Sequence, residues 1–129
     1  MTSDTIAKIQ SFSDFARGWS FGEGVPFAPS ILLKATQLIK TAHALGFQET
    51  DVFPGLNGEV MVTIYLGADY WEFTIEPDET VTFAYERDDE TILYEEGLPF
   101  EFAISSITGI ALRNNLHFFE ITRADKVLV

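Results

Sequence analysis

Hydrophobic residues recur at helical spacing in two stretches of the N-terminal third. The first stretch, residues 5–17, has apolar side chains three or four positions apart, which predicts an amphipathic helix. The second, residues 30–46, has a wider apolar stripe, with Ser30 placed to cap the helix and Gly46 placed to end it in left-handed backbone. The apolar positions of the two stripes are Ile6, Ile9, Phe12, Phe15, Ile31, Ala35, Leu38, Ala42 and Leu45. Two helices are therefore expected before the first strand.

From about residue 58 the apolar period changes to two, which is the period of a strand with one buried face. Gly67-Ala68 has glycine first, as a type II′ hairpin turn requires, and Pro77-Asp78-Glu79 supplies a three-residue turn. With these turns every apolar position meets another across the strands: Ile64 with Trp71, Val62 with Phe73, Val60 with Ile75, Ile75 with Val81, Phe73 with Phe83, and Trp71 with Tyr85. A slip of one residue would turn all of them outward. Residues 58–96 therefore predict an antiparallel meander of three strands, with a short fourth strand at Thr91 to Glu95.

The C-terminal part has a weaker pattern. Residues 99–112 have apolar side chains at helical spacing behind Pro99 and predict a helix, while several β-branched residues leave a strand starting at Phe100 open. Residues 116–122 predict a tail strand. The 129 residues thus predict one α+β domain, with two N-terminal helices packed on an antiparallel three- to four-stranded meander, plus a C-terminal helix and strand.

Acidic residues are concentrated in the second half of the chain. The net charge is −12, and residues 69–101 hold twelve of the 20 acidic residues but a single basic one, Arg87. The predicted register puts some of these acids on the exposed sheet face beside two tyrosines, and the rest fall in turns. The candidate partner-binding residues are Tyr65, Tyr70, Glu72, Glu76, Glu86, Asp78, Glu79, Asp88, Asp89 and Glu90.

These acids have two interpretations. They keep the open face of a small sheet soluble, or they form a rigid carboxylate array that docks on a basic protein surface. Such an array can also occupy a nucleic-acid site by imitating phosphate charge. The sequence favours, as its functional hypothesis, a non-enzymatic acidic binding module of the inhibitor, antitoxin or immunity type.

Composition narrows the classes of function. There is no cysteine, which excludes disulfides, thiolate zinc sites and cysteine nucleophiles. The net negative charge disfavours direct binding to nucleic acid and to anionic membranes. The N-terminus does not resemble a secretion signal, and no apolar run has the length of a membrane span. A bacterial-type cytoplasmic protein is expected.

No catalytic, metal or cofactor site is expected either. Asp88-Asp89-Glu90 lacks the alternating ligands and central glycine of a calcium loop. His43 and His117 have no serine nucleophile or second ligand at a suitable spacing. The sequence therefore predicts no enzyme activity and no cofactor.

Two alternative functions stay open. A small-molecule-binding protein or minor enzyme would use an aromatic pocket between helices and sheet, lined by Trp19, Phe21, Phe27 and Trp71. In the simpler interpretation, the aromatic residues of the loop around Gly22-Glu23-Gly24 only close one end of the core. A structural subunit would form a homodimer through the aromatic tail, Leu116 to Ile121.

The loop and the start of the meander also carry a resemblance. Gly18-Trp19-Ser20-Phe21-Gly22, followed by a helix and then by Pro54-Gly55-Leu56-Asn57-Gly58, resembles a loose group of small uncharacterised bacterial proteins. Their pattern is a Gly-Trp-Asp-x-Tyr-Gly-type loop before a helix, then Pro-x-x-x-Gly before a strand. Ser20 stands here in place of the aspartate and Phe21 in place of the tyrosine. Over residues 17–87 the resemblance implies the order helix, then meander, and it implies no activity.

Overall fold

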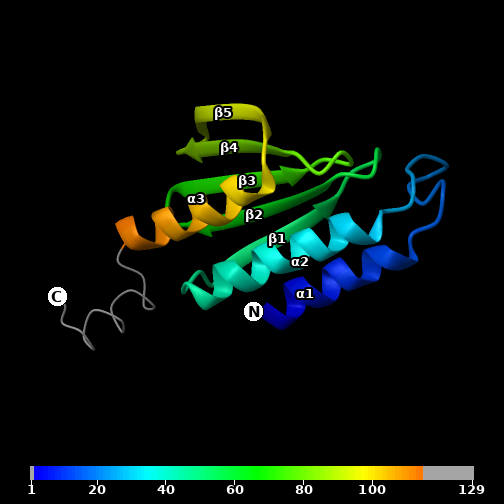
Figure 1. Ribbon diagram of the computed structural model, residues 1–129, viewed down its shortest axis with the longest axis horizontal. Coiled ribbons are helices and arrows are strands. Elements are labelled where there is room, and N and C mark those ends of the chain that lie inside the picture. Colours follow the sequence, from blue (N-terminus) through cyan, green and yellow to red (C-terminus); the bar gives the residue numbers. More distant parts are fainter. Residues whose placement is uncertain (1, 115–129) are drawn as a thin grey trace.

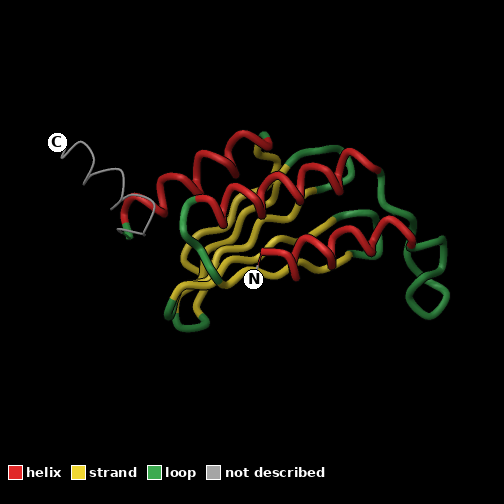
Figure 2. The backbone as a smooth tube through the Cα atoms, turned by 90° about the horizontal axis from the view of Figure 1, so that it is seen from below, coloured by secondary structure: helices red, strands yellow, loops and turns green. Residues whose placement is uncertain are grey.

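The computed structural model describes residues 2–114 and shows two layers, a five-stranded sheet with helices on one face (Figures 1 and 2). The sheet is an antiparallel meander in which each strand pairs with its neighbours in the chain, in the order β1-β2-β3-β4-β5. The other face of the sheet is left uncovered by helices (Figure 2). The elements are α1 (Thr2–Ser11), a 3-10 turn η1 (Phe12–Asp14), α2 (Pro29–Ala44), β1 (Glu49–Pro54), β2 (Val60–Leu66), β3 (Asp69–Ile75), β4 (Val81–Arg87), β5 (Glu90–Leu98) and α3 (Phe100–Arg113).

Both N-terminal helices are present, with shifted ends. The first α-helix ends at Ser11 rather than near residue 17, because the next three residues form the 3-10 turn η1, which places Phe12 in the core. The second begins at Pro29 with Ala28 as its N-cap, so Ser30 is not the cap. Its C-terminal end is as predicted: Gly46 has φ +104°, and the next amide returns to the carbonyl of Ala42 at 3.0 Å. This is the Schellman arrangement, which satisfies carbonyls that the helix leaves unpaired.

The meander confirms the predicted register. All six predicted apolar pairs are observed as cross-strand partners between β2, β3 and β4. Gly67 has φ +62° and Ala68 has no positive φ, as the type II′ turn requires. The predicted fourth strand is longer than expected, because β5 runs from Glu90 to Leu98.

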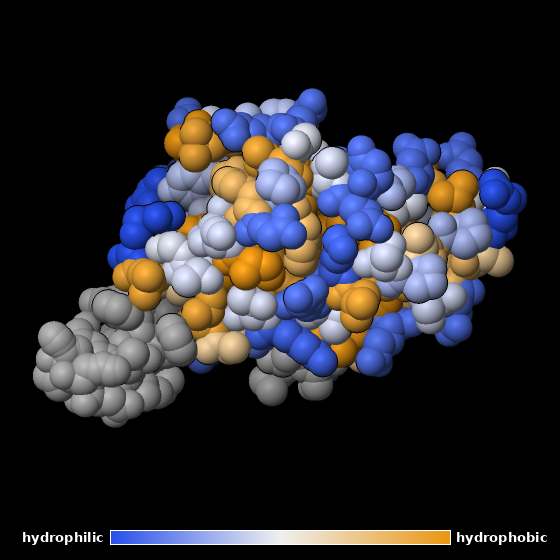
Figure 3. All heavy atoms as spheres, viewed as in Figure 1, coloured by the Kyte–Doolittle hydropathy of each residue, from blue (hydrophilic) through white to orange (hydrophobic). Residues whose placement is uncertain are grey.

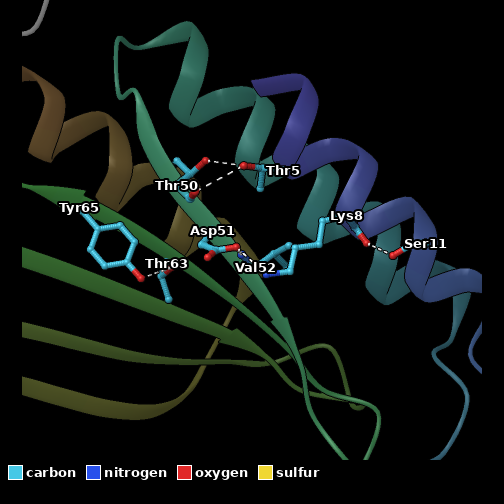
Figure 4. A network of polar contacts seen from close by, with 8 residues as sticks. All are labelled: Thr5, Lys8, Ser11, Thr50, Asp51, Val52, Thr63 and Tyr65. Carbon is cyan, nitrogen blue, oxygen red and sulfur yellow. Dashed lines mark hydrogen bonds and ion pairs between the residues drawn. The ribbon is translucent and has the colours of Figure 1, made fainter. Parts of the chain in front are cut away.

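The sheet has a fifth strand that the sequence pattern did not predict. β1 pairs antiparallel with β2 over its whole length, with Val52 opposite Val62. Its polar composition and Pro54 hide the alternation, and Val52 is its one buried residue. The strand is stabilised from its outer side, where Thr5 of α1 donates to the carbonyl of Thr50 at 3.4 Å and Lys8 pairs with Asp51 at 2.8 Å (Figure 4).

The core lies between the sheet and the helical layer. Phe73 is fully buried and contacts Phe83, which in turn meets Phe102 of α3 edge-on at 5.4 Å between ring centroids. Residues 99–112 were predicted as a helix with a strand left open, and α3 confirms the helix. Its buried stripe of Ala103, Ile107, Ile110 and Ala111 is helically spaced and packs on α2 and β4, which outweighs the low propensity of its β-branched residues.

The predicted tail strand, residues 116–122, lies outside the described residues, as does the homodimer surface predicted there. Between residues 2 and 114 no helix has both the length and the apolar character needed to cross a membrane.

Candidate acidic site on the open face of the sheet

Carboxylates and tyrosines gather on the sheet face that the helices leave open. We call this surface the acidic face and define it by Tyr65, Tyr70, Glu72, Glu76, Glu86, Tyr94 and Glu96. Strand alternation places them together: Tyr70 lies between Tyr65 of β2 and Glu86 of β4, and Glu72 lies opposite Ala84, which in turn faces Tyr94 of β5. The acidic face therefore spans four strands.

Hydrogen bonds hold these side chains in place. The Tyr70 hydroxyl donates to Glu72 Oε1 at 2.8 Å, and the Tyr94 hydroxyl donates to Glu96 Oε2 at 2.7 Å. Both pairs are two residues apart on one strand, which is the spacing of side chains on one face. Thr82 donates to Glu76 at 2.8 Å. The carboxylates are thus oriented by neighbouring hydroxyl groups.

A cavity of about 560 Å³ opens at one end of the acidic face. It forms where the β2–β3 turn and the β4–β5 turn lie side by side, joined by a hydrogen bond from the Asp88 amide to the Ala68 carbonyl at 3.2 Å. Asp88 and Asp89 both have positive φ, of 52° and 66°, which is the backbone of a type I′ turn. The lining residues are Tyr65, Gly67, Ala68, Asp69, Tyr70, Glu72, Glu86, Asp88 and Asp89.

The cavity has a strong negative charge, most of which is not compensated by ion pairs among residues 2–114. Five of its lining residues are acidic and none is basic. Only Asp69 has a cationic partner, since Arg87 donates to it at 2.8 Å and the Tyr85 hydroxyl at 2.7 Å. Glu72, Glu86, Asp88 and Asp89 form no ion pair within the described part of the chain. Carboxylate oxygens beside aromatic rings suit an ammonium or guanidinium group.

The surroundings of Tyr70 change the pKa of its hydroxyl group. Burial, together with the hydrogen bond to Glu72 and the charges of Glu72 and Glu86, raises the pKa of its hydroxyl well above the ordinary value of 10. The rings of Tyr65 and Tyr70 lie 5.2 Å apart. A neutral Tyr70 keeps its proton and donates a hydrogen bond to Glu72, so it adds no further negative charge to the cavity.

We expect Tyr70 to remain protonated above about pH 10, where a tyrosine ordinarily ionises. Because its pKa is higher in the folded than in the unfolded state, its contribution to stability is fully present below about pH 10 and is lost as the pH rises through the folded value. Phenolate absorbance, followed against pH, should show that Tyr70→Phe removes a transition that lies above pH 10. Glu72→Gln should move that transition to lower pH. Loss of an early transition in Tyr70→Phe would contradict the assignment.

The structure brings together six of the ten predicted partner-binding residues in the cavity: Tyr65, Tyr70, Glu72, Glu86, Asp88 and Asp89. Glu76 and Asp78 lie at the opposite end, around a second hollow that also includes Glu96. Glu79 pairs with Lys34 of α2 at 3.4 Å. Glu90 lies opposite Arg87 at the start of β5 and does not line the cavity.

Three residues of this region were not in the sequence prediction: Asp69, Tyr94 and Glu96. Asp69 was identified only as part of the acidic segment, and its place opposite Arg87 follows from the β3–β4 register. Tyr94 and Glu96 depend on β5, whose register shifts between Tyr85 and Glu86 and again between Val81 and Phe83. Such bulges break the simple alternation that a sequence pattern can detect.

The four predicted aromatic pocket residues do not come together in one place. Trp19 and Phe27 pack together at 5.8 Å with Phe12 and Phe15, at the end of the domain where α2 begins. Trp71 packs elsewhere, against Phe47 just beyond the C-terminal end of α2 and against Tyr85. The two tryptophans therefore pack at separate ends of the core, where Trp71 is buried and Trp19 is half-buried.

Phe21 contacts neither group. Its side chain is fully exposed, at 105% of the reference area, because it occupies the tip of a two-residue turn with φ +52°. Ser20 and Glu23 exchange backbone hydrogen bonds across this turn, at 2.7 and 2.9 Å. The expectation that Phe21 helps to close one end of the core is therefore wrong: the backbone that tightens the loop turns this side chain outward.

The surroundings of His43 are those of a residue with a structural role. Its Nε2 lies 3.0 Å from the Thr50 hydroxyl, and burial lowers its pKa. His117 lies outside the described residues. From residue 2 to residue 114, no group of three or more histidine, aspartate or glutamate side chains could hold a metal ion.

The chain matches no protein family model, no curated protein and no solved structure. The fold and the acidic face are therefore the basis for any functional assignment.

Proposed function

We propose that the protein is a non-enzymatic acidic binding module that docks through its acidic face on a basic protein surface, in the manner of an inhibitor, antitoxin or immunity protein. The observation that carries the proposal is the cavity in which two tyrosines meet four carboxylates that form no ion pair within residues 2–114, without a basic residue in the lining. A lysine or arginine side chain of the partner would enter it. The carboxylates of Glu72 and Glu86 would neutralise the charge of this side chain. Its aliphatic part would lie against the rings of Tyr65 and Tyr70.

The arrangement favours docking over simple solubility. Acids that only solubilise a surface need no fixed orientation, whereas Tyr70 and Thr82 here hold carboxylates at 2.8 Å. Charges in a partly enclosed cavity also act through a lower dielectric than charges on a flat surface, so each contributes more to binding. The alternative of an aromatic small-molecule pocket is less well supported, because its four residues do not share a cavity.

Capture of a partner from cell lysate tests the proposal. The immobilised full-length protein should retain a basic protein at low salt and release it at high salt, because exposed charges are screened. The double variant Glu72→Gln/Glu86→Gln should weaken retention by about tenfold, as expected when charges that face a partner are removed.

The matched control is Asp14→Asn/Glu101→Gln, which changes the net charge equally at two exposed positions away from the acidic face. It should bind as the wild type does. Equal loss in both double variants would mean that only the net charge matters. Retention that does not respond to salt would also overturn the proposal.

A further inference from the structure

Phe21 combines an unfavourable backbone conformation with an apolar side chain that is not buried. Its φ of +52° lies in the left-handed region, which costs a residue with a Cβ about 1–2 kcal/mol. Its ring is fully exposed to solvent and gains nothing from burial. Asparagine tolerates this left-handed backbone better. A residue held against its local preference in an ordered loop points to a function.

The loop that presents Phe21 is firmly braced. Gly18 and Gly24 are joined by a backbone hydrogen bond of 2.8 Å at the base of the turn. The Trp19 indole donates to the Val25 carbonyl at 3.0 Å, and the Val25 amide donates to the carbonyl of Leu56 at 3.1 Å. The exposed ring therefore projects from a fixed support, as a preorganised anchor does.

An apolar groove lies between the C-terminal part of α1 and the start of α2. The loop lies at the same end of the helical layer (Figures 1 and 2). The volume of the groove is about 270 Å³, enough for an aromatic ring. Leu33 on its rim is 68% exposed. The lining residues are Ile9, Gln10, Ser13, Pro29, Leu32, Leu33 and Thr36. Figure 3 shows hydrophobic atoms between these helices and also at the loop.

The distribution of acidic and basic residues limits which partners can bind this side of the molecule. Residues 1–68, which include the loop and the groove, hold six acidic and four basic residues. The dense acids of residues 69–101 lie mainly on the acidic face and its turns. Two copies that meet through the loop and the groove keep their acidic faces apart, whereas a contact between acidic faces would be strongly repulsive.

We propose that Phe21 of one copy inserts into the α1–α2 groove of a second copy, and that the second copy makes the same contact in return. Anchor and groove lie at one end of the helical layer, so a two-fold axis can satisfy both contacts and close the dimer. This interface is independent of the acidic face and leaves that face open to its partner. A small apolar contact of this kind gives a weak, reversible dimer.

Sedimentation of the full-length protein over a range of concentrations tests the dimer. The wild type should shift from monomer to dimer as concentration rises. Phe21→Asn removes the anchor and Leu33→Glu blocks the groove, and each should weaken association by at least about tenfold, as for a central aromatic contact. Both positions are exposed, so unfolding curves should show that both variants still fold.

Mixing the two variants gives the decisive measurement. The Leu33→Glu copy keeps its anchor and the Phe21→Asn copy keeps its groove, so one of the two contacts can form in the mixture. The mixture should associate more strongly than either variant alone. The proposal is overturned by a wild type that stays monomeric, by variants that dimerise like the wild type through another surface, or by a mixture without complementation.

Discussion

Gly24→Ala should destabilise the fold by about 3 kcal/mol, the largest loss that we expect from adding a single methyl group. Gly24 has φ +100°, and a Cβ there would lie 2.5 Å from Trp19 Nε1. The left-handed backbone costs alanine about 1–2 kcal/mol, and overpacking a buried contact costs about 1–3 kcal/mol more. Urea unfolding should show a lower midpoint with an unchanged slope.

Gly22→Ala is the matched control for this prediction. Gly22 has a similar φ of +91°, but nothing lies within 4 Å of an added Cβ. It should lose only the backbone contribution, about 1–2 kcal/mol. The difference between the two variants measures how tightly Trp19 packs on the loop. If both variants lose the same stability, Trp19 does not brace the loop as the structure indicates.

Phe21→Asn should have the opposite effect and stabilise the monomer by about 1–1.5 kcal/mol. Asparagine followed by glycine is strongly preferred in a type I′ turn, because both residues tolerate positive φ. The exposed ring makes no buried contact that would be lost. For a chain of this size the melting temperature should rise by about 3–5 °C, measured at a concentration where the protein is monomeric.

Phe21→Ala separates the effect of the ring from the effect of the backbone conformation. Alanine removes the ring but keeps a Cβ in left-handed backbone, so its stability should stay close to that of the wild type. A loss of stability in Phe21→Asn would show that the ring has a structural role in the monomer. It would also remove the reason for treating Phe21 as a docking residue.

The central sheet could be predicted because its determinants are local. Two short turns fix which residues face each other, and alternation fixes which face is buried, so Val62 had to meet Phe73. The strand β1 could not be predicted in the same way. Its pairing depends on α1, which reaches its outer edge through Thr5 and Lys8 from more than 40 positions earlier in the chain.

The types of residue in the candidate site could be predicted from the sequence, but their arrangement in space could be predicted only in part. The register correctly put Glu72 and Glu86 on one face with Tyr65 and Tyr70. The cavity itself requires the β2–β3 and β4–β5 turns to come together, through a contact between Asp88 and Ala68 that no periodicity encodes. The outward direction of Phe21 likewise depends on a positive φ that the residue type disfavours.

The hydrogen bonds within the acidic face have a consequence for recognition. A glutamate on an open surface normally samples several rotamers, and ordering such a side chain on binding costs about 0.5–1.5 kcal/mol. Here hydrogen bonds from Tyr70 and Tyr94 already restrict the orientations of Glu72 and Glu96. The rotational freedom of these side chains is lost when the protein folds rather than when a partner arrives, so the face meets its partner as a nearly rigid template.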